Sequence, residues 1–127
     1  MAGSNSLLVD TNIILYATVY NDDIAKELLK ENSIFISDIT EIELLGYHRL
    51  SDNEHAILSD FITTLTVIPV NTIIKENAIE LRRHYALKTP DSIIAATALY
   101  LDCFLITADK KLQKIDGLQV IEFQSPH

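Results

Sequence analysis

Hydrophobic residues along the chain gather into short continuous runs. Runs of this kind, bounded by polar residues, are typical of strands that are buried on both faces of a parallel sheet. We therefore expect five strands, over residues 7–9, 33–37, 66–70, 104–107 and 119–123.

A second pattern fills the segments between these runs, where apolar residues recur three and four positions apart, as on one face of a helix. It predicts a short helix around Ile13, Ile14 and Ala17, and further helices over residues 22–32, 38–50, 51–65, 71–85, 89–101 and 110–115. Residues 38–41 and 51–54 have the spacing of a capping box, and Thr89 is expected to cap another helix, with Pro90 at the first helical position.

Strands that alternate with helices predict a parallel sheet covered on both faces. The expected fold is α/β, a three-layer α/β/α arrangement with a central parallel sheet of about five strands. A length of 127 residues corresponds to a single domain, residues 1–127. We expect residues 1–6, which are small and polar, to be disordered.

Composition narrows the class of protein. Hydrophobic residues make up 48% and charged residues 22% of the chain, which is typical of globular domains. No apolar run approaches the ~20 residues of a membrane span, and no basic segment followed by an apolar one marks a secretory leader. Cys103 is the single cysteine, so no disulfide can form within the chain. We expect a cytoplasmic protein that does not enter a membrane.

The net charge of −8 is unevenly distributed. Residues 1–63 carry eleven acidic and three basic side chains, whereas residues 64–127 carry seven of each. The acidic first half is suited to a basic protein partner. The bases of the second half are either solvated helix faces or contacts for phosphate groups, and the sequence leaves both open.

Four acidic residues stand at positions that one sheet would bring together. Asp10 and Asp109 each follow an expected strand, at the edge where open α/β sheets bind ligands. Glu43 interrupts an apolar stripe of its helix, and Asp91 lies in the first turn of the helix over residues 89–101. Asp10, Asp91 and Asp109 each have an ordinary structural role as a helix cap or a first-turn acid, whereas a carboxylate on the apolar face that carries Glu43 is costly unless it is paired or binds a metal. Those roles do not explain why all four fall at positions that converge.

Convergence of these four carboxylates would require a cation. Two unit charges 4 Å apart repel by roughly 1 kcal/mol in water and roughly 4 kcal/mol at an effective dielectric of 20. Oxygen ligands favour Mg²⁺ or Mn²⁺ over zinc, and the four histidines are scattered, as surface residues would be. Such an ion supports phosphodiester hydrolysis. With three glycines the chain has no Gly-rich phosphate loop, which argues against a nucleotide kinase.

Four segments that span nearly the whole chain resemble, in order, the motifs of PIN-domain ribonucleases, and in particular the VapC-type toxins of toxin–antitoxin pairs. They are Leu-Val-Asp-Thr-Asn at 8–12, Thr-Glu-Ile-Glu-Leu at 40–44, Thr-Pro-Asp-Ser-Ile-Ile-Ala-Ala-Thr-Ala at 89–98 and Leu-Ile-Thr-Ala-Asp at 105–109. Ala108 departs from the pattern, because many relatives carry a larger or basic residue there.

The resemblance implies a Mg²⁺-dependent endoribonuclease, with Mn²⁺ able to substitute, that leaves a 5′-phosphate and a 3′-hydroxyl. It also implies a homodimer that is silenced by a cognate antitoxin. The implied catalytic and metal-binding residues are Asp10, Glu43, Asp91 and Asp109, with supporting roles for Thr11, Asn12 and Thr107. We add four basic residues as hypothetical RNA phosphate contacts: Arg82, Arg83, Lys88 and Lys110.

Two other classes of function remain open. A haloacid-dehalogenase-like phosphatase would also bind Mg²⁺ on a parallel sheet, but it requires a second Asp where this chain has Asn12. A response-regulator receiver requires paired acids early in the chain and a lone lysine late, which also fits poorly. The remaining alternative is a PIN fold that no longer cleaves RNA and serves as a binding module.

Overall fold

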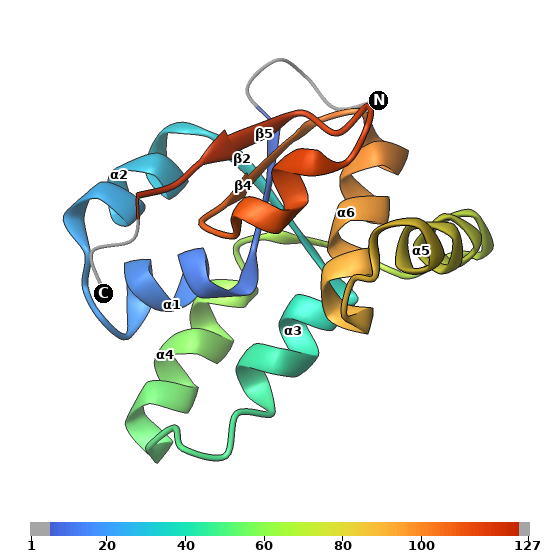
Figure 1. Cartoon of the computed structure of the whole chain (residues 1–127). Coiled ribbons are helices and arrows are strands. Elements are labelled where there is room, and N and C mark those ends of the chain that lie inside the picture. Colours follow the sequence, from blue (N-terminus) through green and yellow to red (C-terminus); the bar gives the residue numbers. More distant parts are fainter. Residues whose placement is uncertain (1–5, 125–127) are drawn as a thin grey trace.

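A computed structural model describes residues 6–124 and places a five-stranded parallel sheet at the centre of the molecule (Figure 1). The strand order is β3-β2-β1-β4-β5. The strands are β1 (Ser6–Val9), β2 (Ser33–Ser37), β3 (Thr66–Ile68), β4 (Phe104–Thr107) and β5 (Val120–Glu122). All five expected strands are confirmed, although β3 and β5 are shorter than their apolar runs.

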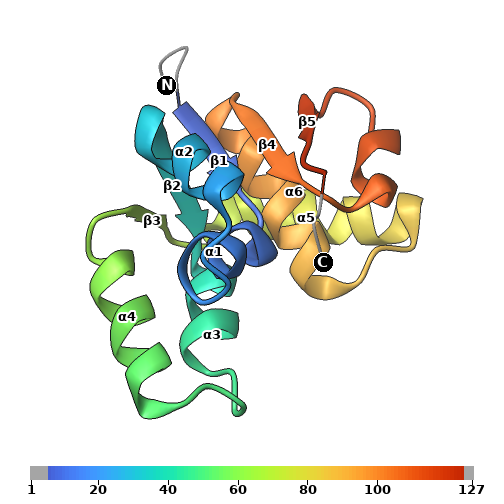
Figure 2. The ribbon, with the colours of Figure 1, turned by 90° about the vertical axis from the view of Figure 1, so that its left-hand side faces the viewer.

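Helices cover both faces of this sheet. They are α1 (Thr11–Thr18), α2 (Asp23–Glu31), α3 (Asp38–Leu45), α4 (Asp52–Ile62), α5 (Thr72–Tyr85), α6 (Thr89–Leu101) and the 3₁₀ helix η1 (Lys110–Lys114). In Figure 2, α1 and α2 lie in front of the sheet and α5 and α6 behind it. The predicted three-layer α/β/α architecture is therefore confirmed.

Side-chain alternation along β1 explains the two apolar layers. Leu7 and Val9 pack into the core beneath α1, α2 and α4, whereas Leu8 packs with residues of α6 on the opposite face. All three side chains are buried, because a central strand of a covered sheet has no solvent face.

The amino-terminal prediction was partly wrong. Ser6, which we expected to be disordered, is the first residue of β1, is buried and pairs with Ser33 of β2. Residues 1–5, which carried the same expectation, lie outside the described residues. The helices between 6 and 124 include none that is long and apolar enough to cross a membrane.

Helix α3 differs from its prediction at both ends. Its cap is Ser37, whose hydroxyl accepts the Ile39 N–H at 3.2 Å, so the predicted capping box at 38–41 is wrong. The helix ends at Leu45 and is capped by Gly46, where a Cβ atom would lie 2.7 Å from the Ile42 carbonyl oxygen. The chain therefore leaves α3 one turn earlier than its apolar spacing indicated.

The other predicted helix starts had mixed outcomes. The capping box of Ser51 and Glu54 is present at the start of α4 and confirms that prediction. At α6 the cap is Lys88, without a side-chain hydrogen bond, and Thr89 is already helical, so the prediction that Thr89 caps this helix is wrong.

The strand order creates a switch point between β1 and β4. From β1 the chain passes to β2 and β3 on one side, and it returns to β4 and β5 on the other. Val9 pairs with Ile106 across the switch, and the Asp10 N–H continues the ladder by donating to the Ile106 carbonyl at 3.0 Å. Crevices at such points, outside the carboxyl ends of the strands, are the usual ligand sites of open α/β sheets.

Candidate functional site

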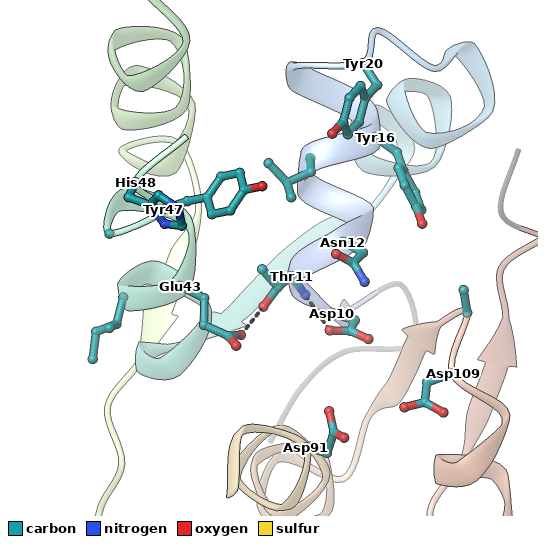
Figure 3. Close-up of a pocket in the computed structure, with 14 residues that line it drawn as sticks. Asp10, Thr11, Asn12, Tyr16, Tyr20, Glu43, Tyr47, His48, Asp91 and Asp109 are labelled. Carbon is teal, nitrogen blue, oxygen red and sulfur yellow. Dashed lines mark hydrogen bonds between the residues drawn. The ribbon is translucent and has the colours of Figure 1, made fainter. Parts of the chain in front are cut away.

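A cleft of about 990 Å³ opens at this switch point. Figure 3 shows the carboxylates of Asp10, Glu43, Asp91 and Asp109 along one part of the cleft and aromatic rings along another. The cleft is lined by Asp10, Thr11, Asn12, Leu15, Tyr16, Tyr20, Ile42, Glu43, Gly46, Tyr47, His48, Asp91, Ala108 and Asp109.

Asp10 is the most firmly held of the four acids. It caps α1, and its Oδ1 accepts the Thr11 N–H at 2.6 Å. Its Oδ2 accepts the hydroxyl of Thr107 at 2.7 Å, and the Thr107 oxygen in turn accepts the Asp109 N–H at 3.0 Å. Thr107 is fully buried, so one hydroxyl ties the loop after β1 to the loop after β4.

Glu43 reaches the cleft from α3. Its Oε1 accepts the Thr11 hydroxyl at 2.7 Å, and that hydroxyl also lies 3.2 Å from the hydroxyl oxygen of Thr40. The sequence placed Glu43 on an apolar face, where an unpaired carboxylate would be costly. The side chain is instead exposed, and the buried face of α3 runs through Thr40 and Leu44. The burial cost therefore does not apply.

Asp91 and Asp109 complete the acidic part of the cleft. Asp91 is half-buried in the first turn of α6, one residue after Pro90. Asp109 caps η1, and its Oδ1 accepts the Lys111 N–H at 2.9 Å. Both roles were anticipated as ordinary structural ones. Both carboxylates nevertheless line the same cleft as Asp10.

Burial first, and then repulsion between carboxylates, raise the pKa of two of these acids, Asp10 and Asp91. Burial is the main cause of the raised pKa of Asp10, which the charges of Asp91 and Glu43 raise further. Hydrogen bonds from Thr107 and Thr11 oppose this shift in the Asp10 pKa.

The pKa of Asp91 is raised first by burial, then by the charges of Asp109 and Glu43. Lys111 and Lys88 lower the pKa of Asp91, and thereby oppose the shift. In the folded chain without a cation, ionisation of both Asp10 and Asp91 is thus disfavoured.

The oxygen atoms that line the acidic part of the cleft are suited to a hard divalent cation, but they are too far apart to surround one. The acidic part of the cleft offers carboxylate and hydroxyl oxygens, the ligands that Mg²⁺ and Mn²⁺ prefer. Within residues 6–124, no three His, Cys, Asp or Glu side chains stand close enough together to coordinate a single ion. Binding of an ion would therefore have to draw the carboxylates together.

The four basic residues singled out in the sequence all lie outside the lining of the cleft. The Arg82 Nε donates to the Leu87 carbonyl at 3.0 Å, and Arg83 forms an exposed ion pair with Glu80 at 3.7 Å. Lys88 and Lys110 are exposed, and only Lys88 is close enough to act on the charge of Asp91. Lys111, which the sequence did not single out, acts on Asp91 as well.

The aromatic part of the cleft was not predicted from the sequence. Tyr16 comes from α1 and Tyr20 from the bend beyond that helix, whereas Tyr47 and His48 come from the turn that follows Gly46. His48 is exposed, as expected of a surface histidine, yet it lies beside the Tyr47 ring in an edge contact with centroids 5.6 Å apart. The spacing of four between Tyr16 and Tyr20 is the one local signal in the sequence for this part of the cleft. The two ring centroids lie 6.3 Å apart, although Tyr20 stands beyond the end of α1.

Comparisons with known proteins agree with this fold. The structure is similar to VapBC2 from Rickettsia felis bound to a promoter DNA fragment, with a TM-score of 0.82, 23% identity, and 94% of this chain and 99% of that chain covered. It is similar to DNA-bound VapBC from Salmonella typhimurium, with a TM-score of 0.82, 21% identity, and coverage of 92% and 97%.

A toxin–antitoxin complex from Klebsiella pneumoniae has 30% identity and a TM-score of 0.76, with 91% of this chain and 95% of that chain covered. No curated protein matches the chain. The family model of the PIN domain matches residues 7–118, which include all four acids of the cleft. The resemblance seen in the four motifs is thereby confirmed, and the chain belongs to the PIN-domain family.

Proposed function

We propose that this protein is a Mg²⁺-dependent endoribonuclease that hydrolyses RNA phosphodiester bonds as the toxin of a toxin–antitoxin pair, with Mn²⁺ able to replace Mg²⁺. The observation that carries the proposal is that four carboxylates from four separate segments line one cleft of a PIN fold. Its similarity to a Klebsiella toxin–antitoxin complex at 30% identity supports the role as a toxin.

In this proposal Asp10, Glu43, Asp91 and Asp109 bind the ion. A bound divalent ion supplies a Lewis acid for the phosphoryl oxygen and lowers the pKa of a bound water. Thr107 orients the carboxylate of Asp10 through its hydrogen bond to Oδ2. Thr11 holds both Asp10 and Glu43, through its N–H and its hydroxyl.

The raised pKa values have a consequence for loading of the site. Asp10 and Asp91 retain a proton more readily than ordinary carboxyls in the absence of a cation. A cation favours their ionised forms, so its binding should release protons and tighten as the pH rises. Asn12 is exposed at the same edge, where its amide is available to a substrate or to a ligand of the ion.

Among the predicted phosphate contacts we favour Lys88. It caps α6 beside the acidic cleft, whereas Arg82 is engaged by the Leu87 carbonyl and Arg83 by Glu80. Lys111, which also acts on the charge of Asp91, is a second candidate. Lys110, which is exposed on η1, is the third proposed contact.

The proposal includes two protein partners, an antitoxin and a second copy of this chain. The acidic first half of the chain is suited to a basic antitoxin segment, and co-purification with the product of the adjacent open reading frame would test this. We also propose a homodimer. Sedimentation of the purified chain at micromolar concentration should give twice the monomer mass of 14.3 kDa.

Incubation with a mixed RNA pool tests the activity. The native protein should yield fragments with Mg²⁺ or Mn²⁺ and none with chelator, and an Asp10→Asn variant prepared identically should yield none. Equal cleavage by both proteins would assign the activity to a contaminant. If neither cleaves although the native protein binds Mn²⁺ and RNA, the chain is a catalytically silent binding module.

A further inference from the structure

The part of the cleft that faces away from the carboxylates has a different chemistry. It is built from Leu15 of α1, Tyr20 of the bend beyond that helix, Ile42 of α3, and Tyr47 and His48 of the turn after α3, and we call these five residues the aromatic wall. Figure 3 shows the Tyr47 ring directed from that turn across the cleft toward α1, beyond Glu43. The cleft is thus acidic at one end and apolar at the other.

The aromatic wall is accessible to a ligand. Tyr47 is 43% exposed, Tyr20 55% and Ile42 66%, which is high for side chains of this size and polarity. The whole cleft, at about 990 Å³, is as large as the upper end of the roughly 300–1,000 Å³ of small-molecule pockets. An ion at the carboxylates would leave most of this volume for the substrate.

Charge decides which part of an RNA substrate could lie on this wall. No described residue that lines the cleft is Lys or Arg, so phosphate groups would find no counter-charge there except a cation held by the carboxylates. A nucleobase is neutral and has a flat π-face, and bases stack on Tyr and His side chains in single-stranded RNA complexes. The wall therefore matches a base and not a backbone.

The backbone around Gly46 keeps Tyr47 in this position. The tight end of α3 leaves no room for a Cβ at Gly46, and the turn is closed by the Tyr47 N–H to the Leu44 carbonyl at 3.4 Å and the Leu50 N–H to the Tyr47 carbonyl at 3.3 Å. These contacts hold the Tyr47 ring just after the end of α3, four residues beyond Glu43, which belongs to the acidic part of the cleft.

We propose that the aromatic wall is a stacking subsite for one unpaired base of the RNA, adjacent to the phosphate that enters the acidic part of the cleft, with Tyr47 as its principal positioning residue. This inference rests on the proposed ribonuclease function and adds to it one contact between this chain and the substrate, a base held beside the phosphate that is cleaved. A base held against Tyr47 fixes the position of the neighbouring phosphate, so Tyr47 would favour cleavage by orienting the substrate.

Photocrosslinking and binding test the subsite. Single-stranded RNA that contains 5-iodouridine is irradiated with the native protein in Ca²⁺, an ion that also takes oxygen ligands, and the crosslinked peptide is mapped. The crosslink should map to Tyr47 or His48. Tyr47→Leu should weaken RNA binding roughly 5- to 150-fold, the range of aromatic-to-alanine substitutions at base-stacking sites, while Tyr47→Phe retains most of the affinity.

Tyr100 provides the matched control. It is 44% exposed, nearly the same as Tyr47, but it lies near the end of α6 and does not line the cleft. Tyr100→Leu should therefore bind RNA as the native protein does. An oligonucleotide from which the crosslinked base has been removed should bind native protein and Tyr47→Leu equally, because the contact that distinguishes them is then absent.

The outcomes separate the subsite from the ribonuclease itself. Metal-dependent cleavage that is equally fast in the native protein and Tyr47→Leu would overturn the subsite and leave the nuclease intact. A crosslink that maps elsewhere, or a Tyr47→Leu variant that loses antitoxin binding but not RNA binding, would overturn it as well. A native protein that neither cleaves nor crosslinks RNA would overturn both proposals.

Discussion

Replacing Thr107 by valine isolates the hydroxyl that joins the two sides of the switch point. The substitution keeps the shape of the side chain and removes one buried group that donates to Asp10 Oδ2 at 2.7 Å and accepts the Asp109 N–H at 3.0 Å. A lost hydrogen bond to a charged group costs about 1.5–3 kcal/mol, and an orphaned donor about 1–3 kcal/mol. Since both partners are only partly buried, we expect a combined loss of about 2–4 kcal/mol.

The pH dependence of this loss distinguishes the contact to Asp10 from a packing defect. The Thr107 hydroxyl lowers the pKa of Asp10, so the valine variant should have an Asp10 pKa still higher than the raised native one. The native protein gains from the hydrogen bond while Asp10 is ionised, and that gain fades as the pH falls through the folded-state pKa. The stability difference between native and variant should therefore be largest near neutral pH and shrink toward about pH 4.

Urea unfolding in chelator, measured from neutral pH to about pH 4, provides the assay. In a thermal scan near neutral pH, the melting temperature of Thr107→Val should lie about 8–16 °C below that of the native protein, at about 4 °C per kcal/mol for a chain of this length. Thr97→Val is the matched control, because Thr97 is equally buried but its hydroxyl donates only to the Ile93 carbonyl of its own helix, at 2.7 Å. An equal loss in both variants, or one that does not change with pH, would refute the role of Thr107.

Three further outcomes follow from the same contacts. Asp91→Asn should raise the melting temperature in chelator near neutral pH while abolishing RNA cleavage. The folded-state pKa of Asp91 is raised, so the stability that this carboxyl contributes at low pH is lost as the pH rises through that pKa. The asparagine amide does not ionise and has no such loss. Millimolar Mg²⁺ or Mn²⁺ should raise the melting temperature of the native protein, and less so that of Asp91→Asn, as scanning calorimetry can measure. Gly46→Ala should cost about 1–3 kcal/mol in urea unfolding, because its Cβ would lie 2.7 Å from the Ile42 carbonyl oxygen.

The fold could be predicted from the sequence because its strands are encoded locally. Each of the five apolar runs is short and bounded by polar residues, and each forms a strand. The strand order could not be predicted, since parallel strands buried on both faces have nearly interchangeable patterns. That order is what sets β1 beside β4, and with them Asp10 and Asp109 on either side of the switch point.

The aromatic wall could not be predicted for a similar reason. The apolar spacing of α3 continues to Leu50, and this hides the break at Gly46. At this break the backbone of Gly46 lies so close to Ile42 that a Cβ atom would stand 2.7 Å from the Ile42 carbonyl oxygen. A pattern of hydrophobic positions carries no information about such a backbone contact. Once α3 ends at Leu45, Tyr47 turns into the cleft instead of continuing along a helix.

Neutral hydrogen-bond donors hold the carboxylate of Asp10 in a fixed orientation without cancelling its negative charge. A lysine or arginine beside Asp10 would hold the carboxylate but would also neutralise it and compete with any cation. Thr11 and Thr107 donate to Asp10 without bringing a charge, so they orient the carboxylate and only partly offset its raised pKa. The lysines that act on Asp91 do so from outside the lining of the cleft. The repulsion that remains destabilises the empty site, and that same unbalanced charge favours the binding of a divalent ion.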